Sequence, residues 1–421
     1  MSRSLSVAGL RRRLPRGPGL GPGVTTLFWS YLIWNLGYAL YVTLLTLYLQ
    51  SLGLELTTVG LIVGGAAIGR MLLAVPAGTL VDRTSPGPVL LATMVLPVAG
   101  VMVLVAANAW WMALAGSLLV ELSGLGIPAL SAWLAGLASS EGRTRAYQWV
   151  YTVGPQVANL LGPALAGLIA ATVGYRPVFA VAAGAFGAGA ALVGPMVLRS
   201  RRRPAATPAA GSPDVSDETS ASPEPIPIGV MLRRPGIRLV ILLHVLVPLL
   251  PYAGFVLSGN LLVDARGLDV AVYGLLGSLA SGVGLVAAVV SGRVRWLRDP
   301  FAGLAACLFA GALALVLLLP DAGLALLVVV YVFRGLLSPV WSYLSAAVAD
   351  VTPERARGRV FGLAEAGAGV GDVGAPLVAG RLYAADPVLP AVFGAVTTLP
   401  LALVLAFARR RRGVVASPDY P

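Results

Sequence analysis

The sequence is poor in charged residues and has almost no histidine or cysteine. Only 11% of its 421 residues are charged, whereas 57% are hydrophobic. Soluble domains carry about 25% charged residues, so this chain has too few charges to cover a water-facing surface. The composition excludes a soluble enzyme, a disordered protein and a coiled coil, and it indicates a chain that lies in a lipid bilayer. The single cysteine, Cys307, cannot form a disulfide within the chain.

Residues that usually carry catalysis or hold a metal are also scarce. The one histidine, His244, leaves no histidine base to spare for a nucleophile, and there is no P-loop or Cys/His cluster. Residues 369–374 fit the dinucleotide pattern G-x-G-x-x-G, but they fall in an apolar run and follow no strand, which that pattern requires. We therefore expect no enzyme activity, no catalytic residues, no cofactor and no metal, with energy drawn from a gradient.

Apolar runs long enough to cross a bilayer recur twelve times. A crossing helix needs roughly 20 mostly apolar residues, and these runs are too long for the strands of a membrane barrel. The predicted spans are 25–50, 57–81, 88–107, 110–138, 146–171, 176–198, 238–263, 269–293, 300–319, 322–349, 359–385 and 387–408. The predicted fold is an all-α membrane protein with twelve transmembrane helices in two six-helix bundles.

The polar segments divide the chain into domains. Residues 1–24 and 409–421 form terminal tails, and 25–198 and 238–408 form the two bundles. Between the bundles, residues 199–237 are rich in Pro, Ala, Ser, Arg and acidic residues. This composition cannot bury a core and predicts a flexible linker.

Lysine is absent, and the 30 basic residues are all arginines, which cluster on one side of the predicted topology. The tails, the linker and the loops of that side hold 25 of them, the opposite side holds three, and Arg70 and Arg334 fall inside spans. By the positive-inside rule both termini and the linker are cytoplasmic. The net charge of +12 is thus explained by topology and anionic lipid, and we expect no nucleic-acid partner. Abundant Ala and Gly beside the arginines indicate a GC-rich bacterial source, and hence a multi-pass protein of the bacterial plasma membrane.

The two halves contain the same sequence pattern. At an offset of 214, the matches are Gly53-Leu54 with Gly267-Leu268, Gly60-Leu61 with Gly274-Leu275, Gly78 with Gly292, and Arg143, Arg145 and Tyr147 with Arg357, Arg359 and Phe361. At an offset of 213, Pro163 and Gly167 match Pro376 and Gly380. A parallel repeat of six plus six spans is an architecture of transporters, whose substrate site lies between the halves near the bilayer midplane.

The second span ends in Gly78-Thr79-Leu80-Val81-Asp82-Arg83. This segment resembles the G-x-L-x-D-R signature between spans 2 and 3 of the major facilitator superfamily. The resemblance implies that Gly78, Asp82 and Arg83 form a cytoplasmic latch of the outward-facing state, in which Asp82 caps a helix of the opposite half. The family's basic cluster is replaced here by residues 84–88, and Trp296 stands opposite Asp82 in the second copy, so we expect a weak latch.

A second motif lies in span 5, at Gly162, Pro163 and Gly167. It resembles the G-P-x-x-G-G motif found mostly in exporters of the family, with Ala166 in place of one glycine. Its proline allows the helix to kink, and its glycines allow the helix to pack closely on a neighbour. The alternative is a set of packing glycines that any helical bundle uses. Within the family the pattern is nearest to drug:proton exporters.

Five charged residues fall inside spans and away from the span ends, where charge is expensive and indicates function. They are Arg70, Glu121, Arg334, Glu365 and Asp372. The resemblance implies that spans 1, 4, 7 and 10 line the cavity, which places Glu121 and Arg334 there in opposite halves. Many family members carry an arginine in the middle of span 4, where this chain has Glu121.

A buried carboxylate that takes up a proton loses its charge, as a coupling site requires. Our hypothesis is that Glu121 exchanges a proton for substrate, with Arg334 as its partner or as the contact of an anionic substrate. The alternative is a structural ion pair or a water-facing charge. Glu365 and Asp372 lie seven residues apart on one helix face. They form a proton path, or one of them pairs with Arg70.

The remaining candidates for substrate binding are polar or aromatic residues of the predicted cavity helices. They are Trp34, Asn35 and Tyr38 in span 1 and His244 and Asn260 in span 7. Each has a structural alternative in core packing or in an interfacial aromatic belt.

The sequence predicts a monomeric secondary transporter that works by alternating access. The first choice is proton-coupled export of small apolar or amphipathic molecules. The alternatives are proton-coupled uptake of a sugar or organic anion, and a membrane receptor on the same fold that moves no solute.

Overall fold

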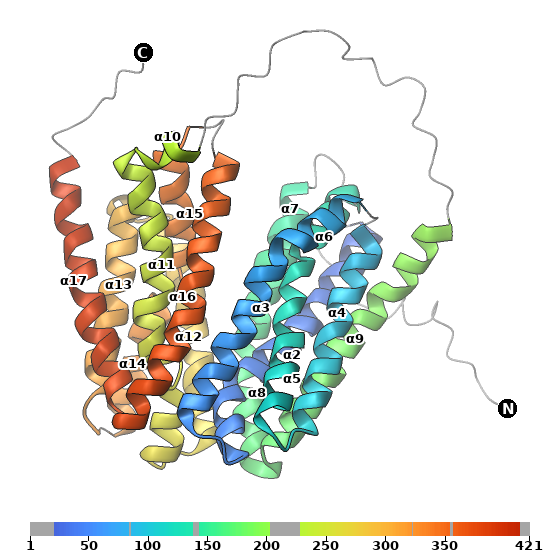
Figure 1. The fold of residues 1–421 in the computed structure, drawn as a ribbon, viewed down its shortest axis with the longest axis horizontal. Coiled ribbons are helices and arrows are strands. Elements are labelled where there is room, and N and C mark those ends of the chain that lie inside the picture. The colour runs from blue at the N-terminus through green and yellow to red at the C-terminus, as the bar shows by residue number, and fades with distance from the viewer. Residues whose placement is uncertain are drawn as a thin grey trace, which may run out of the picture.

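The computed structural model describes residues 21–83, 86–137, 143–202, 228–321, 323–353 and 357–412. Within these ranges the chain is helical and forms no β-strand. Figure 1 shows two helical bundles side by side, the first made from the N-terminal half of the chain and the second from the C-terminal half. The predicted all-α fold of two bundles is confirmed.

The first bundle contains six membrane-crossing units. Its elements are α2 (Pro22–Ser51), α3 (Leu56–Arg83), α4 (Pro86–Val105), α5 (Trp110–Glu121), the 3₁₀ helix η1 (Leu122–Gly126), α6 (Ile127–Leu137), α7 (Arg143–Tyr147), the π-helix η2 (Gln148–Val153), α8 (Gly154–Val173) and α9 (Tyr175–Arg202). The fourth crossing runs from α5 through η1 into α6, and the fifth from α7 through η2 into α8.

The second bundle has the same order of crossings after a short helix. Its elements are α10 (Ile228–Leu232), α11 (Pro235–Phe255), the π-helix η3 (Asn260–Ala265), α12 (Val270–Ser291), the 3₁₀ helix η4 (Arg295–Arg298), α13 (Pro300–Leu318), α14 (Leu324–Leu336), α15 (Val340–Val351), α16 (Arg357–Ala385) and α17 (Leu389–Arg412). Helices therefore occupy both edges of the predicted linker, and its central residues 203–227 lie outside the described residues.

Eleven helical segments of the described chain are long and apolar enough to cross a membrane. The remaining long helix is α16, with 29 residues. It carries Glu365, Asp372 and Arg381, which lower its hydropathy. This helix packs against α11 in its own bundle and against α3 in the other bundle. It therefore lies at the boundary between the bundles, where a charged helix is tolerated.

Local sequence signals explain where several helices begin and turn. The carboxylate of Asp269 accepts a hydrogen bond from the backbone N–H of Ala271 at 2.7 Å and so caps α12. Asp299 caps α13 in the same way through the N–H of Ala302, also at 2.7 Å. These are N-cap interactions that satisfy the free N–H groups of a first helical turn. Gly53 and Gly267, which match in the repeat, both follow the end of a crossing and have a positive φ, of 82° and 70°.

The ends of the crossings define two faces of the molecule. We call the face that holds Arg202 and Ile228 the linker face, and the opposite one, which holds Ser51 and Leu389, the far face. Figure 1 shows the linker face at the top, where the bundles lie apart, and the far face at the bottom, where they approach each other.

The bundles meet along two glycine seams toward the far face. In the first, α3 packs on α16, and a Cβ added at Gly60 would overlap the carbonyl oxygen of Pro376. In the second, α8 packs on α12, and a Cβ added at Gly274 would overlap the carbonyl oxygen of Pro163. Small residues allow backbones to approach this closely.

The two seams are copies of each other. Gly60 and Pro376 match Gly274 and Pro163 in the repeat. A Cβ added at Gly167 would lie 2.5 Å from the carbonyl oxygen of Val270, and the equivalent distance from Gly380 to Leu56 is 2.6 Å. The sequence repeat is therefore also a repeat of contacts, and it closes the far-face half of the boundary between the bundles.

Candidate functional site

A cavity of about 540 Å³ lies between the two bundles. Its walls come from both halves of the chain, as expected for a transport site between repeats. The lining side chains are Tyr38, Val63, Ala67, Arg70 and Glu121 of the first bundle, and Val247, Pro248, Pro251, Tyr252, Phe255, Arg334, Leu337, Ser338, Val340, Trp341 and Asp372 of the second. The volume falls within the range of small-molecule sites, about 300–1,000 Å³.

Two smaller cavities adjoin the first. One of 370 Å³ extends along the second glycine seam, since Pro163 and Gly277 line it together with Thr46. The other, of 210 Å³, lies within the first bundle and is lined by Tyr31, Trp34 and Asn35 among others. Tyr38 and Glu121 line all three cavities. These two residues therefore lie where the three cavities meet.

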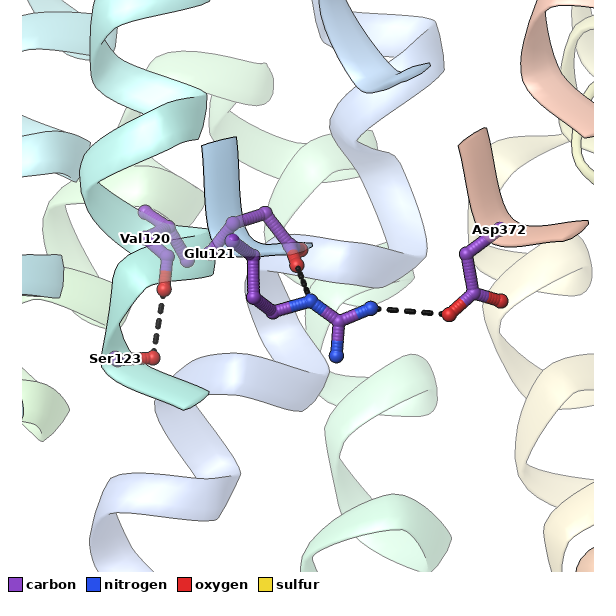
Figure 2. A network of polar contacts seen from close by, with 5 residues as sticks. Val120, Glu121, Ser123 and Asp372 are labelled. Carbon is purple, nitrogen blue, oxygen red and sulfur yellow. Dashed lines mark hydrogen bonds and ion pairs between the residues drawn. The ribbon is translucent and has the colours of Figure 1, made fainter. Parts of the chain in front are cut away.

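Three charged side chains form a network beside this junction. The Nε of Arg70 lies 3.2 Å from Oε2 of Glu121, and its NH2 nitrogen lies 3.0 Å from Oδ2 of Asp372. Arg70 and Glu121 belong to the first bundle and Asp372 to the second, so the network crosses the boundary (Figure 2). All three side chains line the largest cavity, and they are 38%, 22% and 29% exposed.

This network revises one prediction and resolves another. Glu121 pairs with Arg70, so the prediction that Arg334 is its partner is wrong for this structure, because Arg70 lies nearer on the adjacent helix. The alternative that one of the α16 carboxylates pairs with Arg70 is confirmed for Asp372. Glu365 is exposed and does not line the three cavities described above.

The charged residues of spans 4 and 10 both lie where the helix is interrupted. The α-helical part of span 4 ends at Glu121 and continues as the 3₁₀ helix η1. Span 10 ends its first helix at Leu336, two residues after Arg334, and resumes at Val340. Irregular backbone at membrane depth is tolerated where it lines a cavity. The two helix interruptions therefore lie at the depth of the candidate site, one in each bundle.

Arg334 lies between aromatic rings. Its guanidinium carbon is 5.1 Å from the centre of the Phe255 ring and 5.2 Å from that of Tyr331. The side chain lines both the largest and the second cavity. Among the residues that the structure describes, no carboxylate lies within 4.0 Å of its guanidinium nitrogens.

The span 1 candidates form an aromatic stack. Trp34 stacks between Tyr31 and Tyr38, with ring centres 5.8 and 6.2 Å away. Its Nε1 donates a hydrogen bond to the carbonyl of Met94 at 3.2 Å. Asn35 donates from Nδ2 to the carbonyl of Tyr31 at 2.7 Å. The third cavity is lined by all four of these span 1 residues: Tyr31, Trp34, Asn35 and Tyr38. The structure therefore brings the candidates Trp34, Asn35 and Tyr38 together at the site.

The two span 7 candidates lie elsewhere. Asn260 is buried and donates from Nδ2 to Oε1 of Gln50 at 2.5 Å and to the carbonyl of Thr46 at 3.2 Å. His244 is buried, with Nδ1 2.7 Å from the carbonyl of Val240. Neither side chain lines the three cavities. The structure therefore places both in helix packing, which was their structural alternative.

The remaining motif residues lie at the ends of helices and in the seams. Gly78, Asp82 and Arg83 form the last turns of α3, and their side chains lie outside the described part of the chain. A Cβ at Gly162 would overlap Ala39 on the neighbouring α2, whereas Pro163 and Gly167 face α12 across the second seam. The close packing expected of this motif is therefore present, and part of it joins the two bundles.

Several cavity residues were not selected from the sequence. Tyr252 and Phe255 lie one turn apart on α11 beside Pro248 and Pro251, and Trp341 lies in the first turn of α15. An aromatic pair at i and i+3 in a proline-containing span is a usable signal, but an interfacial belt gives the same pattern. Within the described residues there is no group of three metal-ligating side chains.

Comparison with known proteins gives the family. The sequence profile of the Major Facilitator Superfamily matches residues 27–320 and, in a second overlapping match, residues 253–420. The chain belongs to the Major Facilitator Superfamily. No curated protein sequence matches it.

Solved transporter structures resemble this superfamily member over most of its length. The nucleoside transporter NupG aligns with a TM-score of 0.67 at 12% identity, covering 92% of this chain and 98% of that one. A POT family transporter in complex with a thioalcohol-conjugated peptide gives 0.70 at 13%, covering 92% and 96%. The peptide transporter POT in complex with sulfate gives 0.66 at 17%, covering 97% and 99%. At such identities the likeness establishes the fold, that of a multi-pass membrane transporter.

Proposed function

We propose that this superfamily member is a proton-coupled exporter of small apolar or amphipathic molecules, with Glu121 as the principal proton-carrying residue. The observation that carries the proposal is the position of Glu121, which lines all three cavities and pairs with Arg70 at 3.2 Å. A carboxylate in that position can meet both the substrate and a proton. Asp372 shares Arg70 and takes part in the same step, and Glu365 delivers protons along α16.

The proposed mechanism follows from the shared arginine. With both carboxylates charged, Arg70 holds the two bundles together through its contacts to Glu121 and Asp372. A proton on either one removes one attraction and frees the guanidinium to reorient. Rearrangement of the bundles around the cavity is then linked to protonation, as alternating access driven by protons requires.

The walls of the site support an amphipathic substrate. Aromatic side chains Tyr38, Tyr252, Phe255 and Trp341 line the largest cavity together with its charged groups. The direction of transport rests on the exporter-like motif at Gly162, Pro163 and Gly167. We further propose a bacterial plasma membrane location, with the linker face and both termini cytoplasmic, so that the cavity of this structure opens inward. Monomers suffice because both halves of the site lie in one chain.

Energised everted membrane vesicles test the proposal. Vesicles from cells that express the chain are loaded with an acridine dye that reports the pH gradient, and a panel of amphipathic toxins is then added. An exporter consumes the gradient when its substrate arrives, so fluorescence recovers for at least one toxin, and the same cells tolerate that toxin better. Right-side-out vesicles that respond instead would establish uptake and overturn the direction.

Glu121→Gln is the decisive variant. It keeps the size of the side chain but cannot lose or gain a proton, so we expect the gradient response to fall about tenfold or more, since a lost proton-transfer group costs at least that much. Glu55→Gln is the matched control, because Glu55 is exposed at the far-face end of α3 and lines none of the three cavities. A full response in Glu121→Gln would remove Glu121 from the coupling step.

A further inference from the structure

The two arginines inside the spans have different surroundings. Arg70 has two carboxylates, at 3.0 and 3.2 Å. Arg334 has none within 4.0 Å among the described residues, although it lines two cavities. Arg266, at the far-face end of its crossing, lies 4.0 Å from a carboxylate oxygen of Asp321 and donates to the carbonyls of Leu318 and Leu319 at 2.8 Å. Of these three cations, Arg334 is the one that faces a cavity without a carboxylate beside it.

The surroundings of Arg334 fix its orientation without neutralising it. Phe255 on α11 and Tyr331 on α14 place their rings about the guanidinium, at 5.1 and 5.2 Å from its central carbon. The hydroxyls of Tyr331 and Tyr273 are also neighbours of the group, and they carry no charge to balance it. Cation–π contacts engage the flat face of the guanidinium. Its N–H groups point outward from the edge, and their fork matches a carboxylate or phosphate.

An unpaired charge at membrane depth is costly. Glu121 and Asp372 could balance Arg334 at a distance, but both carboxylates are engaged by Arg70 and lie beyond ion-pair distance of Arg334. The cavity therefore separates one arginine that has two direct partners from one that has none. An anion that occupies the cavity next to Arg334 supplies the missing contact.

We propose that the substrate carries one anionic group, which binds the guanidinium edge of Arg334, and an apolar part that packs on the aromatic wall. The class is a small amphipathic organic acid. Tyr38, Tyr252, Phe255 and Trp341 form that wall, and the cavity of about 540 Å³ holds a substituted aromatic acid with room for water. This proposal rests on the proposed function, in that it takes the central cavity as the transport site.

Three probes of one shape separate charge from hydrophobicity: 3-phenylpropionate, 3-phenylpropionamide and 3-phenylpropylamine. Their binding is measured by calorimetry on the full chain in nanodiscs of zwitterionic lipid, which removes anionic headgroups as competitors. We expect the carboxylate to bind about tenfold or more tightly than the amide, the scale of a charged hydrogen bond, and the amine to bind most weakly. Equal binding of carboxylate and amide, or no binding of the carboxylate into the millimolar range, overturns the proposal.

Arg334→Gln tests the residue. It is expected to lower affinity for the carboxylate to that of the amide, and to leave affinity for the amide unchanged. Arg334→Lys keeps the charge but lacks the fork, so we expect an intermediate affinity. The matched control is Arg293→Gln, which removes an exposed arginine of the linker face that lines none of the three cavities. Unchanged carboxylate binding in Arg334→Gln overturns the assignment.

Thermal stability without ligand distinguishes a binding role from a structural one. Because Arg334 pairs with no carboxylate in the described structure, Arg334→Gln is expected to melt at the wild-type temperature or above it. Arg70→Gln leaves Glu121 and Asp372 without their cation and is expected to melt lower. A lower melting temperature in Arg334→Gln, with binding lost for all three probes, would show a structural role and overturn the proposal.

The calorimetry separates this proposal from the proposed function. Carboxylate binding at Arg334 without any response in energised vesicles would refute proton-coupled export and leave the anion site standing. Proton-coupled flux of neutral or cationic toxins, with no carboxylate binding, would refute the anion site and leave export standing. An anionic lipid that displaces 3-phenylpropionate in otherwise identical nanodiscs would identify a headgroup as the ligand of this arginine and overturn an organic acid as the substrate.

Discussion

The glycine seams follow the internal repeat of the sequence, whereas the charged residues of the central site do not. In the seams, Gly60 packs on Pro376 as Gly274 packs on Pro163, and each contact has its copy. The charges of the site have none: at the repeat offsets, Gly284 stands opposite Arg70, and Asn159 stands opposite Asp372. Symmetry is thus kept where the bundles close on each other and lost at the charged network.

This difference has a physical reason. Two bundles that rock about a common centre gain from two equal contacts, because equal contacts open and close together. A bound molecule has no such symmetry, and in the proposed mechanism one proton-carrying network is enough for coupling. Matched substitutions in the two seams should therefore have equal effects. A substitution in the site should have an effect that its repeat mate does not reproduce.

The largest effect is expected from Gly60→Ala and Gly274→Ala. Each adds a methyl group that would overlap a carbonyl oxygen of the opposite bundle, Pro376 or Pro163. Overpacking of this kind costs about 1–3 kcal/mol, which shifts the balance away from the far-face-closed state roughly tenfold. The two variants should act alike. The measurement is maleimide labelling of Thr46→Cys, a second-cavity residue, in a Cys307→Ala background.

Gly184→Ala is the control for both, since a Cβ there meets nothing within 4 Å. Both seam variants are expected to raise labelling from the far face, while the control leaves it unchanged. If only one seam variant raises labelling, the two seams are not equivalent in closure and the comparison fails.

A smaller effect is expected from Asp372→Asn. It removes the 3.0 Å ion pair between the bundles and leaves Arg70 with Glu121 alone. Because Arg70 is 38% exposed, solvent screens the pair, and its loss costs at most about 1 kcal/mol in conformational balance. We expect labelling of Thr46→Cys to change by no more than about fivefold, with a larger loss of proton-driven transport.

The repeat mate of Asp372 sharpens the contrast. Asn159→Asp places a carboxylate at the position of the first bundle that matches Asp372. The residue of the second bundle that matches Arg70 is Gly284, so the new carboxylate has no equivalent arginine to pair with. In an Asp372→Asn background it should therefore restore neither transport nor labelling. Restored transport would show that a carboxylate on either side of the boundary suffices, and that the asymmetry of the site has no functional role.

The smallest effect is expected from Gly53→Ala and Gly267→Ala. Both glycines have positive φ, where a residue with a Cβ is strained by about 1 kcal/mol. They lie in far-face turns outside the seams and the cavities, so melting temperature should fall slightly and equally while transport stays the same. Gly136→Ala, a position with open space and no positive φ, should not lower it. Unequal losses would show that the repeat does not extend to its turns.

The fold was largely predictable because it depends on long apolar runs and on the position of arginines. Span 11 shows the limit: its run at 359–385 predicts a crossing, yet α16, which covers that run, is not among the helices that qualify as crossings by length and hydropathy. The site was predictable in its members and less so in its pairing. Glu121, Arg334 and Asp372 were evident as charges inside spans, but the pairing of Glu121 with Arg70 depends on helix rotation, which apolar periodicity hardly constrains.

The same reasoning explains the residues that the structure places outside the cavity. A polar side chain in an apolar span either meets solute or satisfies a neighbour, and sequence alone does not separate these roles. Asn260 donates a hydrogen bond to Gln50, which lies 210 residues earlier in the chain on another helix. The His244 ring forms a hydrogen bond with the carbonyl of Val240, one turn away on the same helix. Only the packed bundle distinguishes them from Tyr38.

The junction at Glu121 also bears on leakage. A carboxylate that lines several cavities at once could pass protons straight through the protein if water connected those cavities to both faces at one time. At Gly60, Gly167, Gly274 and Gly380 the nearest contacts across the far-face seams are backbone atoms, which do not fluctuate between rotamers. Such a closure resists transient wetting. In the proposed mechanism, tight coupling of protons to substrate therefore depends on these four glycines, although none of them carries the proton or binds the substrate.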